Sequence, residues 1–596
     1  MKGSGAVVPD HPDRKPDQAS PDACVPGRRG DGLMAWVLRR QAGWATALAL
    51  ASLASTAALL LRPTMLGRAV DDAVAGELFS ASLVWTAAVF AVILVAEAVT
   101  ELADPWSTAD ATAGLRRRLL GHVLALDTRQ GRRLEAGDVV SRLVSSAPET
   151  AAAAPAIIEA VGSAVSSIGG VAALWLIDWR LAVAFLTGVP LGTLLIGLFA
   201  RRAAELTASY QTVQGRIAAR LVDALAGIRT IRAAGAVDRE TERVLLPLED
   251  LAAAGRGMWR AYGQVVWRSM LLVPLMEIAV LIVAGLGVVQ GRLSPGQLLA
   301  TVGYVSLGLG FFEQTDIMMR LSRIRGSARR LAEVLGVPAM APGHAALPPG
   351  DGELVLRDVT VRAGGTVLLD RLTLRVPAGV TLAVVGRSGA GKSTLAEVAG
   401  RLSDPDRGQV LLDGADLAMI RPDALRRGIG YAFERPALLG ATIAGMIGYG
   451  RGLLPMASVT RAARTAHADA FIRRLPSGYS TPLATLVLSD GEVQRLGLAR
   501  SLTGDGRLLI LDDATSNLDS VTEMELASAL TSTLPGRTRL IVTHRASTAA
   551  RRPRRLARSR QDQGGRPHAW LWRLPDYRAV FQHEHDNAVA NGDSHA

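Results

Sequence analysis

The residues best suited to chemistry in this chain lie between Gly386 and Thr394, in the segment GRSGAGKST. The segment fits the pattern G-x-x-x-x-G-K-[ST], in which backbone N–H groups at a helix N-terminus bind phosphate. Its glycines let the backbone approach the anion, while Lys392 is expected to reach the β- and γ-phosphates and Ser393 to ligate Mg²⁺. A chance glycine-rich turn is the alternative. We predict binding of ATP or GTP by the whole segment: Gly386, Arg387, Ser388, Gly389, Ala390, Gly391, Lys392, Ser393 and Thr394.

Apolar segments around this loop supply the elements that must position it. Thr381–Val385 before it is typical of a buried strand, and Leu395–Ala399 after it is typical of a helix. Leu508–Leu511 predicts a further strand that delivers two carboxylates, Asp512 and Asp513, to the same edge. We also expect a short strand at Leu540–Val542 and a β-rich opening over Leu354–Val376.

Six apolar stretches precede this part of the chain, and only the fifth contains a charge, Glu277. At 1.5 Å rise per residue, each is long enough to cross a hydrocarbon core of roughly 30 Å. One such stretch could be a buried helix of a soluble protein, but six favour a membrane domain. The stretches are Trp44–Leu61, Leu78–Ala96, Ala160–Ile177, Leu181–Ala200, Met270–Gln290 and Leu293–Phe312.

Charges between the stretches predict the orientation. Arginines dominate before the first stretch, in the long connections 104–155 and 201–266, and after the sixth, whereas the alternate loops are short and nearly neutral. By the positive-inside rule, both termini and the nucleotide part are cytoplasmic. We therefore expect a multi-pass protein of the plasma (inner) membrane. The two long connections are helical in pattern, and each holds a candidate docking segment, Ala136–Leu143 and Leu225–Ala236.

Composition bounds the remaining possibilities. The single cysteine, Cys24, excludes an internal disulfide framework. The formal charge of +12 does not indicate a nucleic-acid partner, because Arg551–Arg573 alone contributes eight arginines against one aspartate. The expected organisation is a disordered segment 1–32, a transmembrane domain 33–336, a linker 337–352, a nucleotide-binding domain 353–582 and a disordered tail 583–596.

Glu277 lies near the middle of its stretch, where an ionised carboxylate is costly. It is a candidate contact for cargo or a cation, and a paired structural glutamate is the alternative.

Taken together, these features resemble an ATP-binding-cassette (ABC) exporter half-transporter, over residues 36 to 550. The fold class implied is an all-α polytopic membrane domain with six transmembrane helices, followed by an α/β P-loop NTPase domain of the ABC type. Ser516–Asp519 (SNLD) resembles the D-loop, with Asp519 at its end, and His544 resembles the switch histidine. The segment LSDGE resembles the family signature LSGGQ and consists of Leu488, Ser489, Asp490, Gly491 and Glu492.

The resemblance implies that two cassettes pair head-to-tail, so that each ATP lies between one phosphate loop and the partner's signature. Asp512 and Ser393 would hold Mg²⁺, with Glu434 as a further ligand at the Q-loop position. Asp513 and His544 would act at the γ-phosphate. The cofactors implied are ATP and Mg²⁺, and the partners are a second half-transporter, the bilayer and a transported substrate. Ala136–Leu143 and Leu225–Ala236 match the family's coupling segments.

Four positions depart from the family pattern. Asp513 stands where a glutamate usually polarises water, and a catalytic group misplaced by about 1 Å can cost on the order of 100-fold. Glu434 replaces a glutamine, Asp490 replaces a signature glycine, and Ala363 stands where an aromatic residue usually stacks on adenine. These departures favour a heterodimer with unequal ATP sites over a homodimer.

The segment Arg551–Pro567 has no periodic apolar pattern, although Leu571–Gln582 again resembles the family. A compensated pair of frameshifts would produce this insert, and a basic tail that contacts anionic lipid is the alternative. An authentic insert would leave the cassette without a normal C-terminal strand.

The predicted function is ATP-driven export of a small molecule, lipid or peptide by alternating access. A catalytically impaired regulatory half, which binds ATP while its partner hydrolyses it, is the alternative. A soluble cassette ATPase that acts on DNA or ribosomes is disfavoured by the six apolar stretches. The sequence does not identify the transported molecule, although a cavity rich in Ala, Leu and Val would suit amphiphilic molecules.

Overall fold

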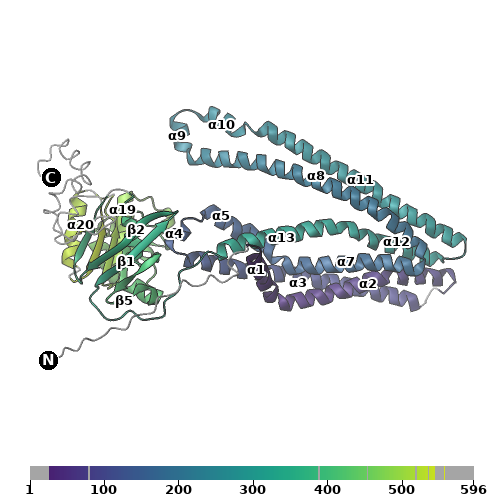
Figure 1. Cartoon of the computed structure of the whole chain (residues 1–596), viewed down its shortest axis with the longest axis horizontal. Helices are drawn as coiled ribbons and strands as arrows, with labels where there is room; N and C mark the ends of the chain where they lie inside the picture. The colour runs from purple at the N-terminus through teal and green to yellow at the C-terminus, as the bar shows by residue number, and fades with distance from the viewer. Residues whose placement is uncertain are drawn as a thin grey trace, which may run out of the picture. The chain divides into compact units, whose positions relative to one another are not determined.

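The computed structural model describes residues 26–77, 81–386, 389–452, 454–516, 518, 520–533, 536–543 and 556–557. These residues form two compact units (Figure 1). The helical unit contains the described residues up to Leu120 together with Ala136–Gly336. The second unit contains the described residues from Val337 onward and also Gly121–Glu135, a segment inserted between two parts of the helical unit.

Long helices build the first unit, and several of them continue through an internal proline, such as Pro63, Pro105 or Pro274. Helices α3, α8 and α11 have 45, 48 and 42 residues and extend well beyond the apolar stretches they contain. The helices are α1 Pro26–Arg40, α2 Ala42–Val74, α3 Ala81–Ala125, α5 Ala136–Ser141, α6 Ala147–Ala151, α7 Ala153–Ile177, α8 Trp179–Ala226, α9 Ile228–Ala233, α10 Val237–Leu245, α11 Leu248–Val289, α12 Pro295–Leu309 and α13 Gln314–Leu335.

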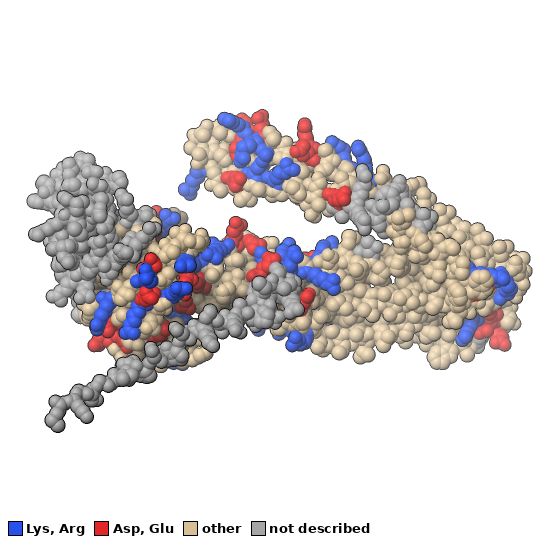
Figure 2. Space-filling model, viewed as in Figure 1, with Lys and Arg blue, Asp and Glu red and all other residues tan. Residues whose placement is uncertain are grey.

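The described residues of all six predicted membrane stretches fall on helices, apart from Gln290 and Leu293–Ser294. Within the described residues, three helical segments are both long and apolar enough to cross a bilayer, namely Ala42–Val74, Ala81–Ala125 and Ala136–Ile177, and Val273–Val289 is a shorter apolar segment of α11. Figure 2 shows a broad surface over these helices on which charged side chains are nearly absent. These helices expose large apolar side chains such as Leu50, Leu94 and Ile168, as expected for contact with lipid rather than water.

The N-terminal prediction needs a correction. Residues 26–32 were expected to be disordered, but α1 begins at Pro26. The helix forms because Leu33 and Val37 are buried, and because α1 packs against α13. Residues 1–25 of the predicted disordered segment, and the predicted tail 583–596, lie outside the described residues.

Two sheets form the second unit. Strands β1 Leu354–Ala363, β2 Thr366–Val376, β4 Arg407–Leu412 and β5 Ala415–Asp416 make an antiparallel sheet in the order β2-β1-β4-β5. The other sheet is parallel, with the order β6-β7-β8-β3-β9. Its strands are β3 Thr381–Val384, β6 Ile429–Ala432, β7 Leu508–Asp512, β8 Thr538–Val542 and β9 Leu556–Ala557.

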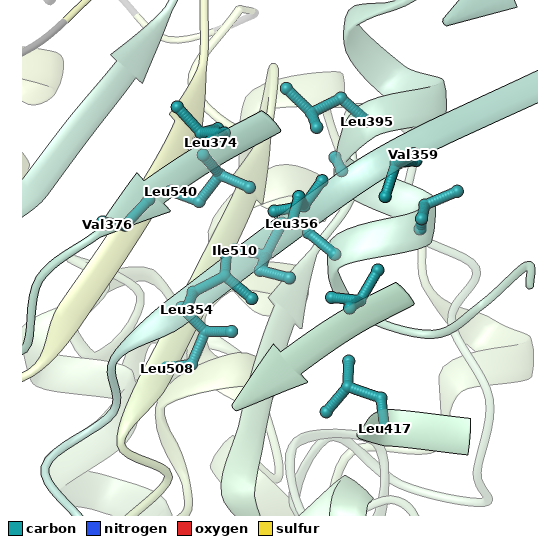
Figure 3. Packing of buried hydrophobic residues seen from close by; sticks show 14 of the residues in the cluster. Leu354, Leu356, Val359, Leu374, Val376, Leu395, Leu417, Leu508, Ile510 and Leu540 are labelled. Atoms are coloured by element: carbon teal, nitrogen blue, oxygen red, sulfur yellow. The ribbon is translucent and has the colours of Figure 1, made fainter. Parts of the chain in front are cut away.

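The cassette core lies between these sheets and the helix that follows the phosphate loop. Leu354 and Leu356 of the antiparallel sheet pack in one cluster with Ile510 and Leu540 of the parallel sheet and with Leu395 (Figure 3). The cassette helices are α14 Lys392–Ala399, α15 Pro422–Gly428, α16 Ile443–Ile447, α17 Met456–Thr465, α18 Asp469–Arg474, α19 Asp490–Leu502 and α20 Ser520–Thr533. The short helix α4, Thr128–Gly131, belongs to the same unit.

Two residues of the arginine-rich insert form a short strand, although its sequence predicts none. Leu556 and Ala557 pair in parallel with Ala383 and Val384 and so extend the sheet beside β3. Leu556 and Ala557 are adjacent apolar residues among the arginines of 551–558, and apolar side chains suit a position beside a buried strand. The rest of Arg551–Pro567 lies outside the described residues.

Close backbone contact between α2 and α12 generates a test of the helical packing. A Cβ atom built on Gly296 would lie 2.0 Å from the Gly67 carbonyl oxygen, so Gly296→Ala must push the helices apart. We expect it to lower stability by about 1–3 kcal/mol, as overpacking does. The measurement is the thermal midpoint in detergent, followed by size-exclusion chromatography.

Gly285→Ala on α11 is the matched control, because nothing lies within 4 Å of its added Cβ. Alanine favours a helix interior by about 1 kcal/mol over glycine, so this variant should be neutral or slightly more stable. Equal midpoints for the two variants would contradict the packing described here.

Candidate nucleotide site

The phosphate loop lies between β3 and α14, as its sequence predicts. Gly389 and Gly391 both have left-handed backbones, with φ of 78° and 85°. Gly391 is the N-cap of α14, and a Cβ there would lie 2.7 Å from the Leu368 carbonyl oxygen, so only glycine fits. Arg387 and Ser388 lie outside the described residues.

Lys392 begins α14 and is buried, with 7% of its surface exposed. Its Nζ donates a hydrogen bond of 2.9 Å to the carbonyl oxygen of Gly386, so the side chain curls back over the loop. Burial lowers the pKa of Lys392, while the negative charges of Asp513 and Asp512 act in the opposite direction. The Nζ group of Lys392 therefore lies beside the first residue of the loop.

Ser393 and Asp512 meet where β7 ends. The Ser393 hydroxyl donates a hydrogen bond of 3.0 Å to Asp512 Oδ1. Burial raises the pKa of Asp512 to about 6; the Ser393 hydrogen bond lowers it, while the carboxylates of Asp513, Glu397 and Glu434 raise it. Hydroxyl and carboxylate oxygens are the ligands that Mg²⁺ prefers, so this pair fits the predicted metal site.

Asp513 has a left-handed backbone, with φ of 46°. Its N–H donates to the Val542 carbonyl oxygen of β8 at 3.1 Å, and its own carbonyl accepts from Ser516 N at 3.2 Å. Aspartate tolerates this conformation better than most residues with a side chain. Strained backbone of this kind is common at functional sites, and here it follows directly after the buried strand β7.

Glu434 follows β6, and its side chain is half exposed, with Oε1 3.8 Å from Arg435 Nε. Its carbonyl oxygen accepts a hydrogen bond of 3.0 Å from Nε2 of Gln494, which also donates to the Ser516 hydroxyl at 2.9 Å. Gln494 is 2% exposed. The sequence-based predictions did not include Gln494, whose tertiary contacts join α19 to the two loops that contain Glu434 and Ser516.

The predicted signature forms the start of α19. Ser489 is the N-cap and makes a reciprocal capping box with Glu492, whose Oε2 accepts from Ser489 N and Oγ, both at 2.9 Å. Asp490 lies in the first turn, where its charge favours the helix dipole. Ser489 and Asp490 are exposed, Gly491 is partly buried, and Leu488 packs against the neighbouring core cluster.

The structure thus brings Lys392, Ser393, Asp512 and Asp513 together at the ends of β3 and β7. In the described part of the chain, no hydrogen bond or ion pair joins Leu488–Glu492 to the phosphate loop. His544 and Asp519 lie outside the described residues. Glu277 is partly buried on α11, beside the buried Met276.

A segment directly before the first predicted docking segment contacts the cassette. Ala136–Leu143 belongs to the helical unit, where Arg142 bonds to the Arg330 carbonyl and lies 3.5 Å from Glu333. The segment that packs with the cassette is Gly121–Glu135, because its polar side chains find partners there. The second segment forms α9, with Leu225 and Ile228 exposed at the end of the α8–α11 hairpin.

Comparison with known proteins agrees with this architecture. The family descriptions "ABC transporter transmembrane region" and "ABC transporter" match residues 46–310 and 369–516. The chain is 42% identical over 542 residues to the ABC transporter ATP-binding protein RamA of Streptomyces coelicolor, covering 89% of this chain and 84% of that protein. It is 31% identical over 456 residues to the ATP-dependent lipid A-core flippase of Chromohalobacter salexigens, covering 74% and 78%.

Solved structures give the same result. A bacterial Atm1-family ABC exporter with ATP bound superposes with a TM-score of 0.72 and 25% identity, covering 92% of this chain and 98% of that one. The chain therefore belongs to the ABC transporter family, as an exporter that joins a transmembrane region to an ATP-binding cassette and couples ATP hydrolysis to transport.

Proposed function

We propose that this chain is one half of a dimeric exporter that moves an amphiphilic small molecule, lipid or peptide outward by alternating access. The proposal depends on the cluster of the buried Lys392 and Asp512 with Ser393, in the same polypeptide as a multi-pass helical unit. Both termini and the cassette face the cytoplasm, and the membrane is the plasma (inner) membrane, as the arginine distribution predicts.

The residues of the phosphate loop have distinct roles in this proposal. Backbone N–H groups of Gly389–Thr394 bind the phosphates, and Lys392 leaves the Gly386 carbonyl to neutralise their negative charge. Ser393 and Asp512 hold Mg²⁺, and Glu434 is a further ligand. When bound, Mg²⁺ offsets the charge that develops on the transferred phosphoryl group.

The raised pKa of Asp512 generates a pH prediction. Between the ordinary pKa of aspartate and about pH 6, Asp512 is protonated in the folded protein but ionised in the unfolded chain. Protonation of Asp512 therefore stabilises the folded, nucleotide-free protein at low pH. Mg²⁺ needs the carboxylate. We expect the Mg²⁺-dependent affinity for ATP to be flat above pH 7 and to fall by up to about tenfold per pH unit below pH 6.

Nucleotide-binding titrations from pH 5 to 8, with Mg²⁺ and with EDTA, measure this effect. Asp512→Asn is the matched control, because it retains the titration of the nucleotide's own phosphates but lacks that of residue 512. A wild-type profile that coincides with that of Asp512→Asn would contradict a metal role for Asp512.

Exposed surfaces in the single chain support a dimeric partner. Ser489 and Asp490 of the signature are exposed, and Val487 beside them is 99% exposed. The end of the α8–α11 hairpin also exposes Leu225, Ile228 and Leu246. Apolar side chains on a cytoplasmic surface favour contact with another protein, so the signature and the hairpin end would both meet the second half.

The carboxylates around the site favour a heterodimer with unequal ATP sites. Asp513 is one methylene shorter than glutamate, and Glu434 adds charge that raises the pKa of Asp512. Asp490 carries a further negative charge on the exposed face where the partner's γ-phosphate would lie. A regulatory half, which binds ATP to close the pair while its partner hydrolyses, is the second candidate and depends on the same residues.

The Asp513→Glu substitution separates these candidates. If the short side chain of Asp513 limits the rate of hydrolysis, we expect Asp513→Glu to raise ATP turnover by about 10- to 100-fold. An improvement of about 1 Å in the position of a catalytic group is worth that much. Turnover of the purified full-length chain in lipid is measured, with Asp513→Asn as the inactive reference. A rate for Asp513→Glu no higher than the parent's would show that reach does not limit hydrolysis.

The partner is tested separately with the wild-type chain. A heterodimer predicts little ATP turnover by this chain alone and at least about tenfold more when it is co-purified with a half-transporter that has glutamate at the Asp513 position. Robust turnover by the chain alone, as a dimer in mass measurements, would establish a homodimer instead.

A further inference from the structure

A tyrosine on β6 lies beside the expected metal ligand and takes no part in the site described above. Tyr431 is the third residue of this strand, and it is paired with Ile510 of the parallel strand β7. Asp512 ends β7 two residues later. Because side chains alternate between the two faces of a sheet, Tyr431, Ile510 and Asp512 share one face.

Apolar packing holds the Tyr431 ring in place. The ring packs against the core cluster that contains Ile510 and Leu395, and its centroid lies 4.5 Å from that of Phe433. A Cβ built on Gly400, at the C-cap of α14, would lie 2.9 Å from Cδ2 of the Tyr431 ring. The ring therefore fills the space that a side chain at position 400 would need, and its surroundings fix where the hydroxyl lies.

Packing does not explain the hydroxyl itself. Its oxygen is buried, and in the described part of the chain it forms no hydrogen bond. A buried polar group without a partner lowers stability, and such groups are uncommon in folded proteins. Phenylalanine would fill the same space without this cost. A polar group retained at such a position points to a partner that bonds to it in another state of the site.

The acceptor for this hydroxyl is identified by the charges around it. Burial raises the pKa of Tyr431, the charges of Asp512 and Glu397 raise it further, and the charge of Arg132 lowers it. Both oxygens of Glu397 already accept hydrogen bonds. Asp512 accepts from the Ser393 hydroxyl through Oδ1. Among the described residues, Oδ2 of Asp512 is therefore the carboxylate oxygen available to Tyr431.

We propose that Tyr431 is a positioning residue for the metal site, whose hydroxyl donates to the Asp512 carboxylate when this carboxylate holds Mg²⁺ together with Ser393. The inference rests on the proposed function, because it takes Ser393 and Asp512 to be the metal ligands. Hydrogen bonds to a ligating carboxylate fix its orientation, and loss of such a partner costs about 10- to 100-fold in metal affinity. Tyr431 itself touches neither metal nor nucleotide.

The experiment compares the effect of Tyr431→Phe on the nucleotide-free protein with its effect on metal-dependent binding. Without nucleotide, the thermal midpoint of the full-length variant in lipid nanodiscs should be unchanged or about 2–4 °C higher, because an unpaired buried hydroxyl is removed. The affinity for the non-hydrolysable analogue AMP-PNP is then measured with Mg²⁺ and with EDTA. The gain in affinity that Mg²⁺ provides should fall by about tenfold or more, whereas binding in EDTA should match the parent's.

Tyr479→Phe is the matched control, because the hydroxyl of this cassette tyrosine is already paired. It donates to Asp469 Oδ1 at 2.6 Å, and Asp469 is not among the expected metal ligands. We expect Tyr479→Phe to lower the thermal midpoint by about 2–4 °C and to leave the Mg²⁺-dependent gain unchanged. The two tyrosine variants should thus differ in both measurements.

A second comparison tests whether Tyr431 acts through Asp512. In an Asp512→Asn background, Tyr431→Phe should cause no further loss of the Mg²⁺-dependent gain, because the carboxylate that the hydroxyl orients is absent. Two residues that act through one interaction are non-additive in this way.

Three results for the variants would overturn the inference. A lower midpoint for nucleotide-free Tyr431→Phe would show that the hydroxyl is already paired. An unchanged Mg²⁺-dependent gain in this variant would show that the hydroxyl does not orient a metal ligand. An equal loss in the Asp512→Asn background would show that Tyr431 acts through another residue. A parent protein without any Mg²⁺-dependent gain would instead remove the proposed metal site itself.

Discussion

The buried charges at the carboxyl ends of β3 and β7 are the constraint on which the cassette depends. Lys392, Asp512 and Glu397 are each less than a tenth exposed, and none would be stable there without a partner. Lys392 uses the Gly386 carbonyl, Asp512 uses Ser393, and Glu397 uses Arg132. Two of these pairs lie where phosphate and metal are expected.

The apolar core of the cassette also positions the residues of the nucleotide site. The parallel strands β7 and β8 are buried along their whole length, and their ends fix Asp512 and the backbone of Asp513. Gln494 then connects the signature helix to Glu434 and Ser516, so one buried amide joins this helix to two loops. Hydrogen bonds thus connect the loops after β6 and β7 to the signature helix, and the end of α14 to the Asp127–Arg132 segment.

The helical unit obeys a different physical rule. Where apolar side chains face lipid, burial from water does not drive helix association, and close packing of small residues has to supply it. Gly67 and Gly296 meet at backbone contact between α2 and α12, and Asp71 accepts from Gly296 N at 2.7 Å beside them. The hairpin of α8 and α11 extends from this packed region and exposes apolar side chains at its far end, which fits a chain that is completed by a partner.

The sequence by itself determined the two kinds of domain, the six apolar helices, the phosphate loop and the strand before Asp512, because each depends on local periodicity or on a short motif. Tertiary structure decided the rest. The contact of residues 127–132 with the cassette is not predicted locally, since the partners of Thr128 and Arg132 are more than 250 residues away. The helical start at Pro26 depends on α13, and the pairing of Leu556–Ala557 depends on β3. Such contacts join residues distant in sequence, so no local pattern encodes them.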